Sequence, residues 1–389
     1  MDTPKTGMPQ RGSIPVAAVH EPAREAEISL HLASQWRLMW WRFRKHKLAL
    51  VSSIVVILVY AVAVFVEFLA PFPTNRMISE LAYAPPQRLH FWERTEEGLR
   101  FGMYVYGYAS EIDVLSLKRT FTVDREQRIA VRFFVKGAPY RLWGLIPGDR
   151  HLIGPVDPGA PMYLLGADRL GRDLFSRMIH GTRVSMTIGL VGVTLSLVLG
   201  VLLGGISGYY GGTADLLIQR VMEILRSMPT IPLWMGLAAA IPTYWSPVLV
   251  YFMITIILSV IGWTWLAQAV RGKFYSLKTE DFVIAAKLDG CSELQVIVSH
   301  MVPSFMSHII ATLTLAIPQM IIAETALSFL GIGLRPPVVS WGVLLREAQN
   351  VRVLATSPWL FLPGTAVIVA VLALNFLGDG FRDAADPYK

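Results

Sequence analysis

The sequence predicts an all-α polytopic membrane protein with six transmembrane helices and a β-rich insertion between the first two. Three observations support this class. The chain of 389 residues is 53% hydrophobic and only 16% charged, whereas soluble domains carry about 25% charged residues. Several runs of low charge reach the roughly 20 residues that a helix needs to cross a bilayer. One long polar segment, residues 72–183, separates the first run from the others.

The spans follow from the positions of these runs. Residues 227–270 are uncharged and long enough for two helices, with the turn PTYWSP (Pro242–Pro247) between them. The chain therefore divides into a basic N-terminal segment (1–47), a first span (48–70), the insertion (72–183), a core of five spans (184–380) and a tail (381–389). The runs are Leu48–Val66, Val184–Tyr210, Ser227–Val270, Ser304–Leu334 and Val353–Gly378.

Lysine and arginine in the short loops predict the orientation, because cytoplasmic loops carry an excess of both. They precede the first span (WRLMWWRFRKHK) and lie between spans two and three and between spans four and five, while the turn between spans three and four has none. Both termini and the loop 280–303 are therefore expected in the cytoplasm, and residues 72–183 outside. The net charge of +7 fits contact with lipid headgroups better than binding to nucleic acid.

The insertion has the composition of a soluble domain. Residues 119–136, RTFTVDREQRIAVRFFVK, alternate enough to predict two strands around a charged turn at DREQ (124–127). The aromatic segment Phe101–Tyr108 predicts another strand, and Gly and Pro predict a loop over 137–161. We expect a small β-rich extracytoplasmic domain; an irregular lid with little sheet is the alternative.

Two features lie within the predicted spans. Gly200, Gly204 and Gly208 fall on one helix face, where bare backbone lets another helix approach closely. This stripe fits either packing within the chain or a contact lining a passage. Glu324, the single acid of span five, is expected near the outer boundary, where water can reach it. An intramembrane acid raises the hypothesis of a functional site, but structural hydrogen bonding or a wet outer cavity is favoured over proton relay.

The sequence contains no pattern for covalent chemistry. It has no GxxxxGK[ST] phosphate loop, no GxSxG elbow and no histidine pair at metal-ligand spacing. We therefore expect no catalytic residue, no metal site and no cofactor bound by this chain, which is not expected to be an enzyme. Its single cysteine, Cys291, excludes an internal disulfide.

Residues 281–303, DFVIAAKLDGCSELQVIVSHMVP, predict a polar helix-turn-helix between two spans. Gly290 can adopt a left-handed backbone at the turn without steric cost, and Ser292 can cap the second helix. Ala285 and Ala286 have small side chains that leave a shallow surface, which a partner could contact.

This segment resembles the EAA loop of ABC importer permeases, with IAAKLDG, nine residues, His300 and a final M-V-P. EDFVIAA is similar to the form EDYVLAA of the peptide-carrying subfamily, although Ile284 replaces the first Glu of EAA. Three other stretches resemble dipeptide and oligopeptide permeases of the second-subunit type. They are Leu164–Leu190, Ala323–Leu334 and Leu377–Pro387.

The resemblance implies a type I ABC importer-like fold and a channel-forming subunit of an ATP-driven importer in the bacterial cytoplasmic (inner) membrane. It implies a homologous permease, two ABC ATPase subunits that carry ATP and Mg, and an extracytoplasmic solute-binding protein as partners. The hairpin would transmit ATPase motion. The solute stays open among peptide, nickel, opine and oligosaccharide. The implied coupling residues are Ala285, Ala286, Lys287, Leu288, Asp289, Gly290, Glu293, Leu294 and Pro303.

The stretch before span two predicts an extracytoplasmic elbow. It either ties the chain to the bundle through an Arg172–Asp173 or related ion pair, which is favoured, or contacts a partner. Two other functions compete with the importer: an ion-gradient-driven secondary transporter, which would need charged sites near the midplane, and a membrane-anchored receptor acting through residues 72–183. The elbow residues are Gly166, Asp168, Gly171, Arg172 and Asp173.

Overall fold

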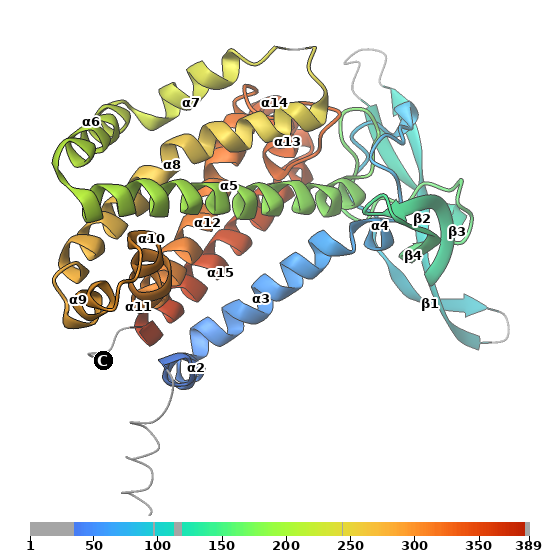
Figure 1. Ribbon diagram of the computed structural model, residues 1–389. Coiled ribbons are helices and arrows are strands. Elements are labelled where there is room, and N and C mark those ends of the chain that lie inside the picture. Colours follow the sequence, from blue (N-terminus) through green and yellow to red (C-terminus); the bar gives the residue numbers. More distant parts are fainter. Residues whose placement is uncertain (1–34, 96–97, 113–118, 243, 386–389) are drawn as a thin grey trace, which may run out of the picture.

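The computed structural model describes residues 35–95, 98–112, 119–242 and 244–385. The predicted terminal segments are therefore described only in part, since 1–34 and 386–389 lie outside these residues. Within the described residues, five helices are long and apolar enough to cross a membrane, and they pack as one bundle (Figure 1). These helices are α3 (Lys47–Val64), α5 (Leu174–Tyr210), α8 (Pro247–Leu277), α12 (Met306–Phe329) and α15 (Leu362–Ala385).

The passage from α5 to α8 differs from the prediction, because the third predicted span is too short. The first half of the apolar run Ser227–Val270 forms only α7 (Thr230–Ala239), whose 10 residues extend about 15 Å, half of the roughly 30 Å of hydrocarbon. The amphipathic helix α6 (Gly212–Ser227) precedes it, and the two run in series along the bundle (Figure 1). Pro229 separates them, because proline cannot donate a helical hydrogen bond. Five helices of the described residues, not six, thus meet the length of a span.

The predicted turn after α7 is present. Trp245 N donates to the Pro242 carbonyl oxygen at 3.3 Å, and Ser246 caps α8, whose first residue is Pro247. Residue 243 lies outside the described residues. The turn places the start of α8 at the same end of the bundle as the start of α5 (Figure 1).

The glycine stripe of α5 packs directly on α8. A methyl group added at Gly204 would lie 2.4 Å from the carbonyl oxygen of Ala267, and one at Gly208 would lie 2.6 Å from that of Arg271. At Gly200 it would lie 2.9 Å from the Cβ of Leu266. Only glycine allows this approach, so the stripe serves packing within the chain, as one of the two interpretations predicts.

A four-stranded antiparallel sheet in the order β1-β2-β3-β4 occupies the region between α4 (Val66–Leu69) and α5. Its small core packs on the loop that leaves α4. The long strand β3 pairs with β2 through its first half and with β4 through its second half. The strands are β1 (His90–Thr95), β2 (Gly98–Ile112), β3 (Arg119–Leu142) and β4 (Ile146–Pro155), preceded by the short helix η1 (Ser79–Leu81).

The turn predicted at DREQ is wrong. Residues 124–127 form a bulge inside β3, since Gly107 pairs with Asp124 while its neighbour Tyr106 pairs with Arg128. Asp124 Oδ1 accepts hydrogen bonds from the backbone of Glu126 and Gln127, which holds the extra residues without reversing the strand. The predicted loop over 137–161 likewise contains the end of β3 and all of β4, which are joined by a tight hairpin.

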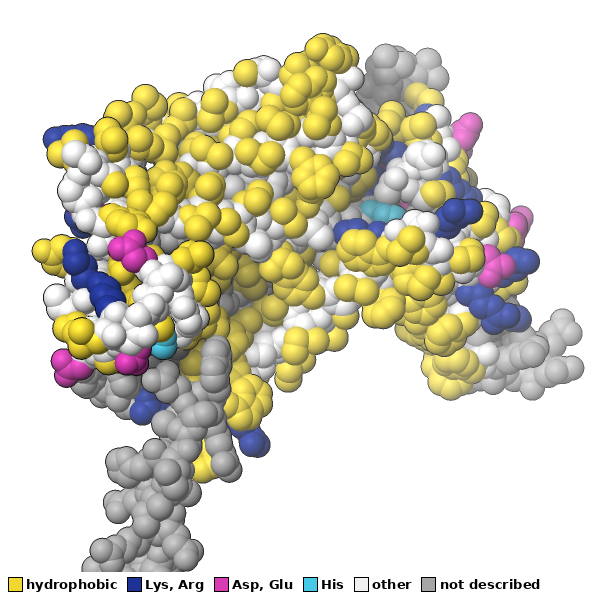
Figure 2. All heavy atoms as spheres, in the orientation of Figure 1, with side chains coloured by type: hydrophobic (Ala, Val, Ile, Leu, Met, Phe, Trp, Pro, Cys, Tyr) yellow, Lys and Arg dark blue, Asp and Glu magenta, His cyan; other side chains and the backbone are white. Residues whose placement is uncertain are grey.

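The sheet and the short helices within residues 281–304 lie at opposite ends of the bundle (Figure 1). On the face in Figure 2, hydrophobic side chains cover the middle of the bundle, and charged side chains gather toward its two ends. α2 (Gln35–Lys45) and the end of α15 lie at the end with the short helices, where the rings of Phe43 and Phe381 stack with centroids 4.8 Å apart. The chain therefore begins and ends, within the described residues, on one side of the bundle.

The remaining short helices connect the long ones. α9 (Asp281–Leu288), α10 (Glu293–Gln295), the π-helical turn η2 (Val296–Met301) and α11 (Val302–Ser304) lie between α8 and α12. α13 (Trp341–Leu345), η3 (Arg346–Gln349), α14 (Val351–Thr356) and η4 (Pro358–Phe361) lie between α12 and α15.

Candidate functional site

The turn of the hairpin between α9 and α10 has the predicted geometry. Gly290 has a φ of 81°, in the left-handed region that favours glycine. Its N–H donates to the Lys287 carbonyl oxygen at 3.1 Å, and the N–H of Cys291 donates to that of Ala286 at 3.1 Å, which closes α9. Ser292 Oγ then accepts from Gln295 N at 3.4 Å and caps α10, as predicted.

One face of the hairpin is buried against its own chain. Val283, Val296 and Met301 are fully buried and pack with Phe274 of α8. Ala286 belongs to the same cluster, so its side chain does not form the exposed surface that the sequence predicts. Because α9 and η2 both contribute to this cluster, the hairpin is tied to the ends of α8 and α12 rather than suspended in solvent.

The other face exposes large apolar side chains. Leu288 and Leu294 are 83% and 71% exposed, next to exposed Ala285 and Gly290. Large apolar groups are thus exposed on an otherwise polar hairpin. We call these side chains the hairpin surface: Phe282, Ile284, Leu288, Leu294 and Val298.

Charged side chains form a rim around this surface, and part of the rim contacts α5. Lys287 Nζ lies 5.0 Å from the centre of the Tyr209 ring, and Glu293 lies beside the hydroxyl of Tyr210. Asp289 is exposed, and so is Pro303 at the start of α11. The rim thus fixes the turn against the end of α5 and leaves its apolar groups free to contact another protein.

An ion pair braces the same end of the bundle. Asp215 of α6 accepts hydrogen bonds from Arg271 of α8 at 2.7 and 2.6 Å, and Ser207 of α5 also donates to it. The hydrogen bonds from Arg271 lower the pKa of the Asp215 carboxyl to about 2. Three helices are therefore joined beside the hairpin.

At the opposite end, the elbow is built around buried Asp168. Its carboxylate accepts from Arg172 Nε at 2.6 Å, from Arg177, and from the backbone of Leu170 and Arg172 at 2.8 and 3.0 Å. Arg172 therefore pairs with Asp168, and the named Arg172–Asp173 pair is wrong, while the related ion pair is present. Glu347 of η3 joins the group, 3.5 Å from Arg172 and 3.8 Å from Arg177.

Asp173 has a different role from the one expected. It caps α5, accepting from Ser176 N at 2.7 Å and Ser176 Oγ at 2.6 Å. Burial outweighs these hydrogen bonds and raises the pKa of Asp173 to about 6. Gly166 and Gly171 both have positive φ, and a side chain at Gly171 would collide with the backbone of Ile78. The elbow is a tightly packed structural joint.

Glu324 is fully buried within the chain, and the predicted access to water is wrong. Its carboxylate accepts hydrogen bonds from Ser328 and Ser340, both at 2.7 Å, and from Ser185 at 3.4 Å. Ser340 in turn caps α13, and Ser185 accepts from the backbone of Trp341. Glu324 thus joins α5, α12 and α13, which is the structural hydrogen bonding that the sequence favours.

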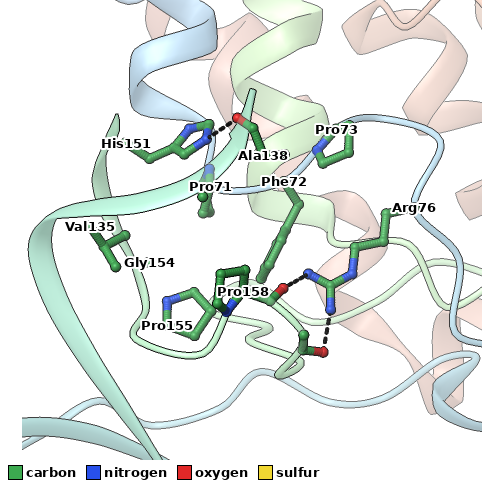
Figure 3. A pocket seen from close by; sticks show the side chains of 12 residues that line it. Pro71, Phe72, Pro73, Arg76, Val135, Ala138, His151, Gly154, Pro155 and Pro158 are labelled. Atoms are coloured by element: carbon green, nitrogen blue, oxygen red, sulfur yellow. Dashed lines mark hydrogen bonds between the residues drawn. The ribbon is translucent and has the colours of Figure 1, made fainter. Parts of the chain in front are cut away.

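A cavity of about 370 Å³ lies between the loop after α4 and the β3–β4 hairpin (Figure 3). Arg76 closes one side by donating to the carbonyl oxygens of Pro158 and Gly159, and His151 bonds to the Ala138 carbonyl oxygen at 3.0 Å. No cluster of three or more potential metal ligands occurs in the part of the chain that the structure describes.

Apolar spans, a glycine-packed helix pair and an exposed hairpin at one end define a polytopic membrane protein. A model of the family "Binding-protein-dependent transport system inner membrane component" matches residues 200–388, and a model of the N-terminal TM domain of oligopeptide transport permease C matches residues 34–86. The sheet lies between the two matched segments.

Curated relatives agree with these matches. The oligopeptide transport system permease protein OppC of Bacillus subtilis (strain 168) is 34% identical over 238 residues, 61% of this chain and 75% of that protein. The OppC protein of Haemophilus influenzae is 37% identical over 226 residues, 58% of this chain and 70% of that protein. The dipeptide transport system permease protein DppC of B. subtilis is 34% identical over 231 residues, 59% of this chain and 70% of that protein.

The chain therefore belongs to the inner membrane components of binding-protein-dependent transport systems. It is a multi-pass inner membrane permease subunit of the ABC importer class, and the family is one of transport proteins rather than enzymes. The sequence resemblance to dipeptide and oligopeptide permeases is confirmed.

Sequence reasoning missed three of the residues that build these regions. Arg177 and Glu347 complete the elbow, and Asp215 braces the hairpin end. Arg177 and Glu347 come from elements far apart in the sequence, and so do Asp215 and Arg271. Arg177 also lies in the first turns of α5, which begins at Leu174, ahead of the predicted span at 184. The one available signal was the presence of acids and bases flanking long apolar runs.

Proposed function

We propose that the hairpin couples this permease to an ATPase subunit and drives alternating access to a path for peptides. The observation that carries this proposal is the hairpin surface, whose apolar side chains are exposed although the opposite face is buried in the bundle. A surface of this kind, with a charged rim, fits a groove on another protein.

The hairpin is placed to act as a lever. It connects the end of α8 directly to the start of α12, and its buried face packs on Phe274 of α8 and Phe305 before α12. A displacement of the hairpin would therefore be passed to both helices as rigid-body motion, since packed cores transmit strain rather than absorb it. α8 also packs on the glycine stripe of α5, so the movement would reach a third helix.

The partners in this proposal are a homologous permease, two ABC ATPase subunits and an extracytoplasmic solute-binding protein. ATP and Mg would bind to the ATPase subunits and not to this chain. The hairpin end, with both described ends of the chain, would face the cytoplasm, and the sheet would face outward. Peptides are the proposed solute class, because the oligopeptide and dipeptide permeases are the relatives.

An ion-gradient-driven transporter is the alternative, and the environment of Glu324 disfavours it. A coupling site needs an ionisable group that solvent or an ion can reach from a cavity. Glu324 is instead 0% exposed and surrounded by serine hydroxyl groups.

The test uses the chain assembled with these four partners in proteoliposomes. Gly290→Val is expected to reduce ATP-driven uptake of a labelled oligopeptide at least tenfold while leaving membrane insertion intact. The side chain would meet no neighbour, since nothing lies within 4 Å of an added Cβ, but a left-handed backbone costs a β-branched residue about 1–2 kcal/mol. The turn would therefore open.

Gly144→Val is the matched control. Gly144 has a φ of 74° and also has open space around it, but it lies at the sheet end of the molecule. Uptake of the labelled oligopeptide by Gly144→Val should stay within twofold of uptake by the original chain. Unchanged uptake in Gly290→Val, or uptake that a proton gradient drives without ATP, would refute the proposed coupling.

Docking itself is tested by cross-linking. Leu288→Cys in a Cys291→Ser background should form a cross-link with the ATPase subunit, while Val123→Cys, at the sheet end, should not. Cross-linking at neither position would show that the hairpin surface does not contact the ATPase.

A further inference from the structure

The hairpin that joins β3 to β4 ends in an apolar tip. Residues 142–147 read LWGLIP and contain no charge. Leu145 and Ile146 are 81% and 63% exposed, and Trp143 is half exposed. Phe134, also exposed, lies further back on β3, where its ring is 6.1 Å from that of Phe68 in α4. We call Phe134, Trp143, Leu145 and Ile146 the tip patch.

The position of this tip along the bundle is fixed by one hydrogen bond to α3 and by a cation–π contact with α5. Trp143 Nε1 donates to the carbonyl oxygen of Val64 at 3.0 Å, and Val64 is the last residue of α3. The guanidinium group of Arg183 lies 4.3 Å from the centre of the Trp143 ring and pairs with Glu67 of α4 at 2.6 Å. The tip is thus held beside the point where a membrane-spanning helix ends.

The surface of α3 next to the tip is itself apolar and exposed. Ile57, Val64 and Phe65 are exposed large hydrophobic side chains on this helix or at its end, and α3 is 18 residues long with no charge after its first position. In a membrane protein such a face contacts lipid tails.

The residues around the tip match the boundary between lipid tails and headgroups. Tryptophan is enriched at that level because its ring is apolar while its N–H needs a hydrogen-bond partner. Arg141 and Arg150 are exposed on the two strands that lead to and from the tip. Basic side chains flanking an apolar group bind lipid phosphates while the apolar group enters the acyl region.

We propose that the tip patch inserts into the interfacial layer of the bilayer and anchors the sheet to the lipid surface beside α3. The sheet would then hold a constant height above the membrane, independent of any protein partner. This inference concerns the insertion and does not depend on coupling by the hairpin surface.

The test places a fluorescent label at single cysteines in the full chain, reconstituted in nanodiscs of phosphatidylethanolamine and phosphatidylglycerol. Leu145→Cys, in a Cys291→Ser background, carries an environment-sensitive dye. Val123→Cys is the matched control, because Val123 is an exposed apolar residue on β3 away from the tip. Gel filtration and the thermal transition verify that both labelled chains remain folded.

Lipids with a nitroxide close to the headgroup should quench the label at position 145 at least twofold more than the label at position 123. Aqueous iodide should quench the label at position 123 at least threefold more than the label at position 145. Equal iodide quenching at both positions would overturn the proposal. Protection from iodide without quenching by the lipid nitroxide would overturn it too, since protein would then cover the tip.

Discussion

The contact between α5 and α8 at Gly204 allows the packing of the bundle to be tested with one added methyl group. In Gly204→Ala, the new Cβ would lie 2.4 Å from the Ala267 carbonyl oxygen and 2.9 Å from its Cα. Carbon atoms pack at about 3.5–4.0 Å, so the two backbones must separate by roughly 0.6–1 Å. Both atoms belong to the backbone of α8 and cannot rotate away.

Gly205→Ala is the matched control, one residue along the same helix. There the added Cβ would lie 3.4 Å from the Phe274 ring, which is an ordinary contact. Both substitutions gain the same helix propensity of about 1 kcal/mol, so this term cancels between them. The remaining difference is the overpacking of α8, about 1–3 kcal/mol, and Gly204→Ala should be the less stable variant by this amount.

The assay is thermal unfolding of the two purified variants in the same detergent, followed by tryptophan fluorescence. Gly205→Ala should unfold at or above the temperature of the original chain, and Gly204→Ala several degrees below it. Equal transition temperatures for the two variants would refute the close approach of α5 and α8.

Two other predictions concern buried acids. Burial raises the pKa of Asp173 from 3.8 to about 6, so between these values the folded chain binds a proton that the unfolded chain releases, and the free energy of unfolding should fall as pH rises from about 4 to about 6. At about 1.36 kcal/mol per pKa unit, the original chain should lose roughly 3 kcal/mol of stability relative to Asp173→Asn over this window. A stability difference that does not depend on pH would contradict the assignment. Glu324→Ala should lower stability by about 1–3 kcal/mol, because it leaves the hydroxyl groups of Ser328 and Ser340 without their acceptor. Glu324→Gln keeps an acceptor and should lose less. Equal loss of stability in the two variants, measured by thermal unfolding, would argue against these hydrogen bonds to Glu324.

The spans and the hairpin turn were predictable because they depend on neighbouring residues. An uncharged run of sufficient length forms a helix in lipid whatever surrounds it, since its backbone groups bond within the helix. The third span failed for a local reason as well: the run has only 15 residues before the turn at Pro242, and Pro229 shortens the helix further, to the 10 residues of α7. Counting the residues between these prolines would have corrected the number of spans.

The site residues were predictable in position and less so in role. Gly290 and Ser292 have the conformations expected from their chemistry. Ala286 differs, because exposure depends on which helix face meets Phe274 of α8, and the short helix α9 has too few turns for its pattern to indicate that face. The same limit applies to Asp173, whose partner depends on how the elbow folds.

Length and composition of consecutive residues establish the membrane class, the order of the spans and the polar hairpin between α8 and α12. They do so because hydrophobic transfer, glycine conformation and helix capping act over a few residues. The pairing of Arg177 with Asp168 and Glu347, the burial of Glu324 among serines from three segments, and the bond from Trp143 to Val64 follow from the packed structure. Each joins residues from separate elements, and their distance depends on how whole helices and strands pack together.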